Sequence, residues 1–188
     1  MRGRSEMAYE REVSVRIFAK ELRNSKVLYK DGDDQYAPQY LLTPTGAKIN
    51  RVFITGTLTE TENIGTETEY QRGRISDPTG VFLVYAGQYQ PEVCRFLADA
   101  KVPSIVSVIG KISSFETNDG NVIVSIRPEH MQYIDPETRD MWIYETAKQT
   151  YERILTLETD DETIQNVKNH YDVNTNDYKK MVLDALEL

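Results

Sequence analysis

The stretch SIVSVIGKISSFETNDGNVIVSIRP, from Ser104 to Pro128, holds two strand-like runs joined by a short polar turn. Apolar residues recur at every second position in both runs, which is the period of half-buried strands and not of a helix. They are Val106, Val108 and Ile112 in the first run, and Val122, Val124 and Ile126 in the second. Gly110 interrupts the first run, and a glycine there predicts a bulge that lets a long strand curl, as in a small barrel. Asn118, Asp119 and Gly120 supply the turn, with Phe115 beside it.

Three further strands precede this hairpin. Residues 49–60 (INRVFITGTLTE) predict the first strand, with a bulge at Gly56. Its inward-facing residues are Val52, Ile54 and Leu58. Residues 70–76 predict the second strand and residues 81–86 (VFLVYA) the third. The sequence DPTG at residues 77–80 is a strong turn signal, so the second and third strands are expected to pair as a hairpin.

A helix is expected between the third strand and the hairpin of residues 104–128. Residues 91–100 (PEVCRFLADA) begin with a proline, which suits a first helical position, and carry Val93, Phe96 and Leu97 on one side. Five short, curved strands with a helix between the third and the fourth is the order of the OB-fold, a partly open Greek-key barrel. We therefore expect a mainly β protein with appended helices, whose five-stranded OB-fold domain spans residues 46–134.

The N-terminal residues 1–45 are expected to pack on this barrel. Residues 11–22 (REVSVRIFAKEL) fit both an alternating strand and one face of a short helix, and an extended segment that passes into a short helix accommodates both patterns. Residues 30–38 (KDGDDQYAP) are rich in charge and turn formers and predict a solvated loop. Residues 41–47 (LLTPTGA) predict an irregular approach to the first barrel strand.

The spacing of apolar residues becomes that of a helix after Pro136. Apolar residues then recur at spacings of three and four, so residues 135–158 predict a long amphipathic helix suited to assembly. Residues 159–188 predict two short helices in an acidic tail, the second capped by Thr175. Because so few residues cannot bury a large core, these helices are expected either to pack on the long helix or to wait for a partner.

Composition narrows the classes of function. The 188 residues carry a net charge of −8, and residues 135–188, with 6 Lys and Arg against 13 Asp and Glu, account for −7 of it. An acidic total argues against a general electrostatic DNA binder, but not against a groove that binds mainly by stacking. The sequence has neither an apolar run long enough to span a membrane nor a signal peptide, so we expect a cytoplasmic protein without a membrane partner.

The sequence gives little support for a catalytic site or a metal site. Cys94 is the only cysteine, and the two histidines, His130 and His170, are far apart in sequence, so neither a disulfide framework nor a zinc site is expected. The scattered glycines form no phosphate-binding loop, and no histidine or cysteine has a triad setting. We expect a protein that is not an enzyme and needs no cofactor.

Three runs together resemble a known family. VFITGTLTE at residues 52–60, VSVIGKISSF at residues 106–115 and the closing Ile-Arg-Pro at residues 126–128 resemble the OB-fold of the middle-subunit class of replication protein A (RPA). The run APQYLLTPTGAKINRVFITGTL at residues 37–58 is similar to a signature of the archaeal RPA-associated proteins. The resemblance covers residues from about 11 to 157.

This resemblance implies a subunit that binds single-stranded DNA within an RPA complex in DNA replication, repair or recombination. It assigns the family's two stacking aromatics to Tyr85, where the family often has tryptophan, and to Phe115. Both rings could instead be ordinary barrel residues. The tyrosine offers a smaller stacking face, which puts the intrinsic DNA affinity in question.

Basic residues on the strands are the candidates for phosphate contacts. Arg72 and Arg74 lie two apart on one strand, so both guanidinium groups share a face. They could instead pair with the nearby Glu60, Glu62, Glu67 and Glu69. Arg51, Lys111 and Arg127 are further candidates. Phe53 is a weaker stacking candidate, because it could pack beneath the N-terminal segment.

The resemblance also assigns the long helix to a bundle with a large RPA subunit. The expected subunit-interface residues are Trp142, Tyr144, Ala147, Tyr151, Ile154 and Leu155. The same apolar stripe could close the base of the chain's own barrel, and both uses are compatible. A second hypothesis follows, in which the chain is an OB-fold assembly subunit that stabilises a large RPA subunit and binds little DNA itself.

Overall fold

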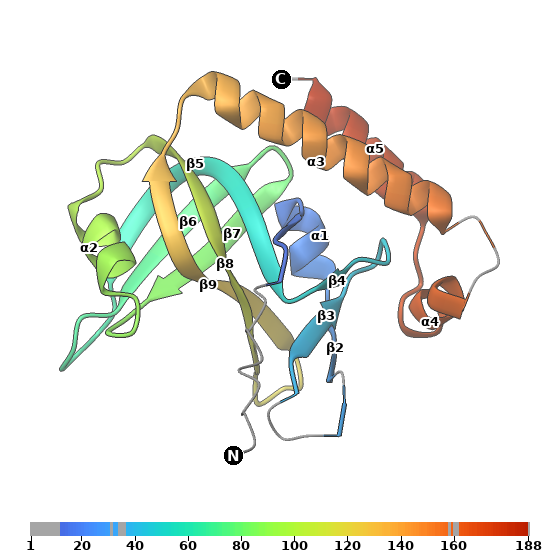
Figure 1. Ribbon diagram of the computed structural model, residues 1–188, viewed down its shortest axis with the longest axis horizontal. Helices are drawn as coiled ribbons and strands as arrows, with labels where there is room; N and C mark the ends of the chain where they lie inside the picture. The colour runs from blue at the N-terminus through green and yellow to red at the C-terminus, as the bar shows by residue number, and fades with distance from the viewer. Residues whose placement is uncertain (1–11, 31, 34–36, 158, 160–161, 188) are drawn as a thin grey trace, which may run out of the picture.

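The computed structural model describes residues 12–30, 32–33, 37–157, 159 and 162–187 (Figure 1). The sequence places the start of the N-terminal segment at residues 1–11 and part of a solvated loop at residues 31 and 34–36, and these lie outside the described residues. None of the described helices combines the length and apolar character needed to cross a membrane.

Five strands form a closed barrel. They are β5 (Arg51–Asn63), β6 (Gln71–Asp77), β7 (Gly80–Ala86), β8 (Ser104–Glu116) and β9 (Val122–Tyr133). Around the barrel the order is β5, β6, β7, β9 and β8, and β8 pairs back onto β5. With α2 (Pro91–Asp99) between the third and fourth strands, this is the topology of the OB-fold, as the strand order in the sequence predicts. The barrel is least tightly joined at β7 and β9, whose register contains the single pair Val84–Ile126.

Two glycines shape the barrel for different reasons. The bulge predicted at Gly110 is confirmed, because the β8–β9 register shifts between Ile109 and Gly110. The bulge predicted at Gly56 is wrong, since the β5–β6 register shifts between Leu58 and Glu60. A Cβ atom at Gly56 would lie 2.4 Å from the carbonyl oxygen of Ser76, so glycine permits a close approach of β6 there.

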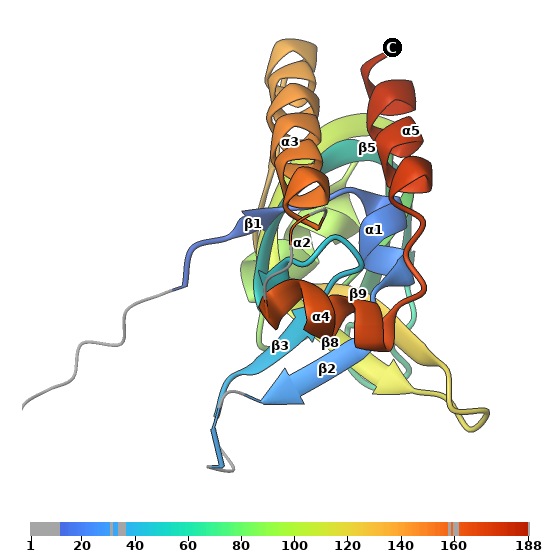
Figure 2. The same ribbon diagram turned by 90° about the vertical axis from the view of Figure 1, so that its right-hand side faces the viewer.

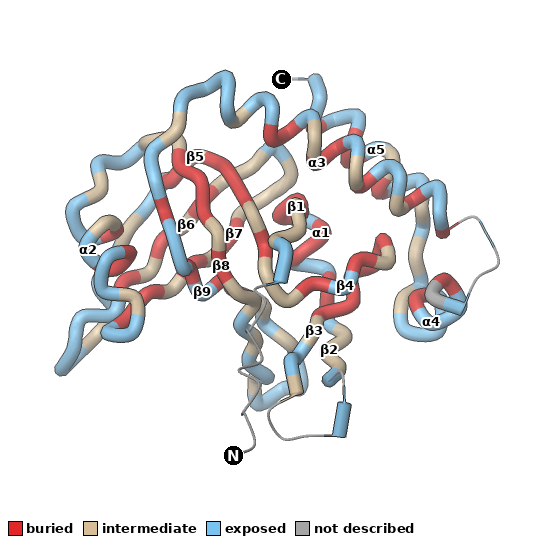
Figure 3. The backbone as a smooth tube through the Cα atoms, in the orientation of Figure 1, coloured by how far each residue is buried: buried red, intermediate tan, exposed pale blue. Residues whose placement is uncertain are grey.

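The barrel is covered at opposite sides by two short helices (Figure 1). α2 lies at one side, and α1 (Ala19–Asn24) lies at the other, after the short strand β1 (Val15–Arg16). This confirms the extended segment that passes into a short helix. Phe18, fully buried just before α1, packs edge-on against Trp142 with ring centroids 5.7 Å apart. Residues 17–22 of the N-terminal segment are therefore part of the core (Figure 3).

A second, three-stranded sheet was missed by the sequence patterns. It consists of β2 (Val27–Lys30), β3 (Gln39–Leu42) and β4 (Lys48–Ile49). The irregular structure predicted for residues 41–47 is therefore wrong for Leu41 and Leu42, which belong to β3. Leu41 and Leu42 are both fully buried, the first in the main core and the second in a smaller cluster with Leu157, Ile164 and Val167. Because β3 ends in two adjacent buried residues, it shows no alternation of apolar and polar residues.

Three helices follow the barrel. α3 (Pro136–Thr156) begins after Asp135, whose side chain accepts a hydrogen bond from the backbone N–H of Thr138. α4 (Glu162–His170) and α5 (Thr175–Leu186) are the two predicted short helices, but the capping residue of α5 is Asn174 and not Thr175. α5 lies beside α3, and both helices extend past the barrel (Figures 1 and 2).

Candidate nucleic-acid interface

A groove of about 590 Å³ lies on the outside of the barrel, between the β5–β6 loop, the segment after β7 and the strands β8 and β9. We call it the aromatic groove. Four aromatic side chains line it: Tyr70, Tyr85, Tyr89 and Phe115. Arg127 adds a positive charge and Glu69 a negative one. Flat, partly exposed rings around one concave surface are what unpaired bases need for stacking.

The alternation of the strands aims Tyr85 and Phe115 into this groove. On β7, Phe82, Val84 and Ala86 are buried in the core, so Tyr85 points outward. Phe115 lies at the end of β8, opposite Ile123 of β9, and 54% of it is exposed. An aromatic ring with that much exposure contributes little to the core and is available to a ligand. The structure thus brings together the two aromatics that the sequence predicted as stacking residues.

Tyr70 and Tyr89 were not predicted. The ring of Tyr70 stacks on that of Tyr85, with centroids 6.1 Å apart and planes 21° apart. Tyr89, between β7 and α2, is 84% exposed. Neither residue lies inside a strand or a helix, so no periodicity distinguishes it. The available signal was the accumulation of tyrosines at positions 70, 85 and 89 around one expected hairpin.

Arg72 and Arg74 pair with glutamates, which is the alternative to phosphate contacts that the sequence left open. Both arginines of β6 lie beside β5, where Arg72 opposes Glu62 and Arg74 opposes Glu60. Arg72 forms a close ion pair with Glu62 and is 3.6 Å from Glu60, while the Nε of Arg74 is 3.5 Å from a Glu60 oxygen. Arg72 also opposes Tyr85 in the sheet, so it borders the aromatic groove. Phosphate contacts by these arginines would compete with the two glutamates.

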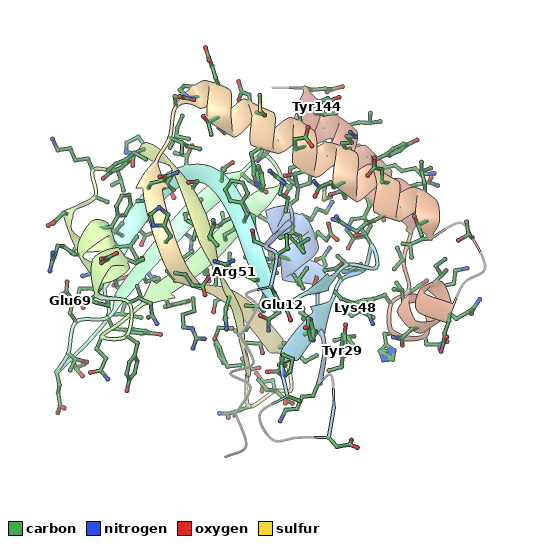
Figure 4. All side chains as sticks on the ribbon, in the orientation of Figure 1. Glu12, Tyr29, Lys48, Arg51, Glu69 and Tyr144 are labelled. Atoms are coloured by element: carbon green, nitrogen blue, oxygen red, sulfur yellow. The ribbon has the colours of Figure 1, made fainter. Side chains whose placement is uncertain are left out.

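Arg51, Lys111 and Arg127 form a row across three strands. Arg51 of β5 opposes Lys111 of β8, and Lys111 opposes Arg127 of β9, so the three side chains share one face of the sheet. The Nε of Arg51 donates to Glu129 at 2.6 Å, and its Nη1 donates to the backbone carbonyl of Glu12 (Figure 4). Of the three, Arg127 lines the aromatic groove.

Phe53, the weaker stacking candidate, does not line the aromatic groove. β1 pairs with β5 so that Arg16 opposes Phe53, and the guanidinium of Arg16 lies 5.2 Å from the centre of the Phe53 ring. Phe53 is partly buried against the core. The N-terminal segment covers this ring, which is the packing alternative that the sequence left open.

The predicted interface residues of α3 divide into two groups. Trp142, Ala147 and Ile154 are buried in the chain's own core, so in this structure they are not available to a partner. The indole N–H of Trp142 donates to the carbonyl of Phe53 at 2.9 Å. Tyr144, Tyr151 and Leu155 are 59%, 44% and 42% exposed, and Tyr144 points away from the barrel in Figure 4.

A buried polar cluster fixes α3 to the N-terminal segment. The carboxylate of Glu21, fully buried in α1, accepts hydrogen bonds from the hydroxyls of Thr43 and Thr45. Arg153 of α3 donates to the other carboxylate oxygen of Glu21 at 3.0 Å and to Thr45 at 2.9 Å. A buried charge held by several donors and one opposite charge makes the position of α3 specific.

The described part of the chain holds no cluster of metal-ligating side chains, since no three His, Cys, Asp or Glu side chains of those residues gather as a metal site needs. Burial raises the pKa of the Cys94 thiol, and Glu69 raises it further, so this cysteine is a poor nucleophile. Burial also raises the pKa of Asp77, although four hydrogen bonds to its carboxylate oppose the shift.

The sequence matches no model of a protein family and no curated protein sequence. Solved structures resemble about half of the chain. The OBody AM2EP06, solved bound to hen egg-white lysozyme, matches with 15% identity and a TM-score of 0.39, covering 46% of this chain and 82% of its own. The mitochondrial single-stranded DNA-binding protein Rim1 of S. cerevisiae matches with 21% identity and a TM-score of 0.36, covering 46% and 95%. The second single-stranded DNA-binding protein of Mycobacterium smegmatis matches with 14% identity and a TM-score of 0.39, covering 45% and 86%.

Proposed function

We propose that this protein is a non-enzymatic subunit that binds single-stranded DNA in the aromatic groove. The observation that carries the proposal is the convergence of Tyr70, Tyr85, Tyr89 and Phe115 on one groove of an OB-fold barrel, with Arg127 among them. Any base presents a flat face, so such rings bind a strand without reading its sequence. A duplex keeps its bases stacked inside and offers this groove nothing to hold.

The charge distribution supports binding by stacking more than by phosphate contacts. The protein carries −8 overall, Glu69 lines the groove, and Arg72 and Arg74 are already paired with glutamates. Each phosphate contact to a single strand adds about −0.7 to the slope of log affinity against log salt. For oligonucleotides short enough to lie in the aromatic groove alone, we therefore expect a shallow salt dependence, of about one or two contacts.

The direct test is fluorescence anisotropy with labelled oligo-dT, measured beside a duplex of the same length at two salt concentrations. The proposal predicts saturable binding of the single strand, little binding of the duplex, and a modest loss of affinity on adding salt. Equal binding of both forms with a steep salt slope would contradict it, because that result describes a non-specific electrostatic surface.

The biological setting that we propose is an RPA-type complex of the archaeal kind, acting in replication, repair or recombination. The support for it is the resemblance of residues 37–58, 106–115 and 126–128 to that family. The partner would be a large RPA subunit, held by the exposed face of α3. That face carries Met141, Tyr144, Lys148, Tyr151 and Leu155 at alternating spacings of three and four residues, and four of these five side chains are largely apolar.

The exposed face of α3 also favours a second candidate function, an assembly subunit that binds little DNA. An exposed apolar stripe of this length is costly unless another surface covers it. The test is co-purification with a large RPA subunit of Tyr151→Asp/Leu155→Asp against a control, Gln149→Asp/Thr156→Asp, which adds the same charge on the flank of the helix. Loss of the complex with the first pair alone supports the stripe as the interface, and an intact complex with both pairs removes it.

A further inference from the structure

A second groove, of about 560 Å³, lies between α1 and the barrel strands β7 and β9. We call it the α1 groove. Arg23 and Lys26 line it from the end of α1 and the residues just after it, and Arg74 lines it from β6. Its floor includes Leu83 and Ile123. Among the described residues that line it there is no Asp or Glu, although the protein as a whole is acidic.

The α1 groove continues the aromatic groove along the same two strands. On β7, Tyr85 lines the aromatic groove and Leu83 the α1 groove. On β9, Arg127 lines the first and Val124 the second. The two strands pair in parallel at Val84–Ile126, and Ile126 lies at the edge of the aromatic groove. A DNA strand that is bound at Tyr85 therefore reaches the α1 groove by following β7 and β9.

Two cations of the α1 groove lie on α1 and just after it, and α1 is bound to the barrel. The carboxylate of Asp77 accepts a hydrogen bond from the backbone N–H of Ala19 at 2.8 Å, and the hydroxyl of Thr79 accepts one from that of Lys20 at 3.0 Å. The β6–β7 turn thus binds the first turn of α1, and Leu22 buries its other side. Arg23 and Lys26 themselves are exposed, and neither forms a salt bridge among those found in the described residues.

We propose that one DNA strand occupies both grooves, with Arg23 and Lys26 contacting its phosphates in the α1 groove. This rests on the proposed function, because it extends the same binding site. Positive groups beside an apolar floor suit a nucleotide, whose phosphate is anionic and whose sugar and base are largely apolar. The other continuation, across β9 and β8 to Lys111 and Arg51, is less suited, since Glu129 already neutralises Arg51.

The test compares the full-length protein with Arg23→Gln/Lys26→Gln on labelled oligo-dT of about 4 to 16 nucleotides, the range of OB-fold site sizes. For the longer oligonucleotides the variant should show a salt slope flatter by about 1.4, that is, two contacts at about 0.7 each. Between about 50 and about 200 mM salt, wild type then loses about sevenfold more affinity than the variant. The shortest oligonucleotides, held by the aromatic groove, should bind both proteins alike. Lys20→Gln is the control, because this lysine lies on the same helix but outside the groove.

The outcomes separate this inference from the proposed function. If wild type binds no oligonucleotide of any length, both are wrong. If binding depends on Tyr85 and Phe115 but Arg23→Gln/Lys26→Gln behaves as wild type at every length, the α1 groove alone is wrong. The α1 groove alone is also wrong if Lys111→Gln flattens the salt slope for long oligonucleotides and the double variant does not. The DNA strand then crosses β9 and β8 towards Lys111 and Arg51.

Discussion

The phenol rings of Tyr70 and Tyr85 stack at a centroid distance of 6.1 Å, so one face of Tyr85 is already covered by a second aromatic. Together the two rings present more aromatic surface than one tyrosine. Tyr70, which lies just before β6, supports the ring of Tyr85 through this stacking contact.

Tyr70→Ala should weaken binding of oligo-dT by about 1 kcal/mol, or about fivefold, because Tyr85 loses its support and the groove loses a stacking surface. Tyr70→Phe keeps the ring and should bind as wild type. Anisotropy titrations of the two variants measure the difference. If alanine and phenylalanine give the same affinity, the stacked pair has no role in binding.

Glu62→Gln should tighten binding. The change removes the closer of the two carboxylates that pair with Arg72, so this cation can reach a phosphate more easily. The salt slope should steepen by about 0.7. The cost in stability should be below about 1 kcal/mol, because both side chains are partly exposed. Glu137→Gln, in the first turn of α3, is the control for the change in net charge, and a matching gain with it would refute the local explanation.

Arg153→Met should lower the free energy of unfolding by about 3–5 kcal/mol, since it leaves the buried Glu21 carboxylate without its opposite charge. Adding Glu21→Gln should recover part of the loss, because a neutral amide is cheaper to bury. Arg139→Met, at an exposed ion pair of the same helix, should change stability by less than about 1 kcal/mol. Urea denaturation measures all three, and equal losses for the two arginines would contradict the role of the buried cluster.

Stability should fall at alkaline pH because of Tyr171, just after α4. Its hydroxyl donates to the carbonyl of Leu42 and accepts from the backbone N–H groups of Lys26 and Val27. Burial raises the pKa of Tyr171 above its ordinary value of about 10, more than the two accepted hydrogen bonds lower it. Above that pH the unfolded chain has lost the proton while the folded chain still keeps it, so stability falls as pH rises. Burial raises the pKa of Tyr178 in the same direction.

Tyr171→Phe separates this effect from the other tyrosines. It should cost about 1–3 kcal/mol at neutral pH, because the hydrogen bonds of Leu42 and Val27 are lost. It should also reduce the additional loss of stability above pH about 10. Tyr144→Phe, at an exposed tyrosine on α3, is the control for the substitution itself. Urea denaturation as a function of pH gives the profiles, and identical curves for wild type and Tyr171→Phe would exclude Tyr171 as the cause.

The barrel was predictable because its strands alternate. Val52 and Ile54 on β5, like Phe82 and Val84 on β7, point to a common core from every second position, and the turn signals fix the ends of the strands. The sheet of β2, β3 and β4 was not predictable in this way. The adjacent Leu41 and Leu42 both face apolar clusters, so the strand that contains them has no polar side to reveal it.

The site was predicted in part for a related reason. Tyr85 lies in an alternating strand, and its outward direction follows from its neighbours. The pairing of Arg72 with Glu62 depends on the register of two strands, which the sequence alone does not specify. The burial of Trp142 depends on where α3 crosses the barrel, because an amphipathic pattern does not say which apolar residues meet the chain's own core.

The most direct test of the central claim is the affinity of Tyr85→Ala/Phe115→Ala for labelled oligo-dT. Each lost ring should cost about 1–3 kcal/mol, so the double variant should bind at least about 30-fold more weakly than wild type. Thermal unfolding should confirm that it is folded, and Tyr144→Ala, on α3, should bind as wild type. If the double variant binds oligo-dT as tightly as wild type, including in an assembled complex, the aromatic groove is not the DNA-binding site.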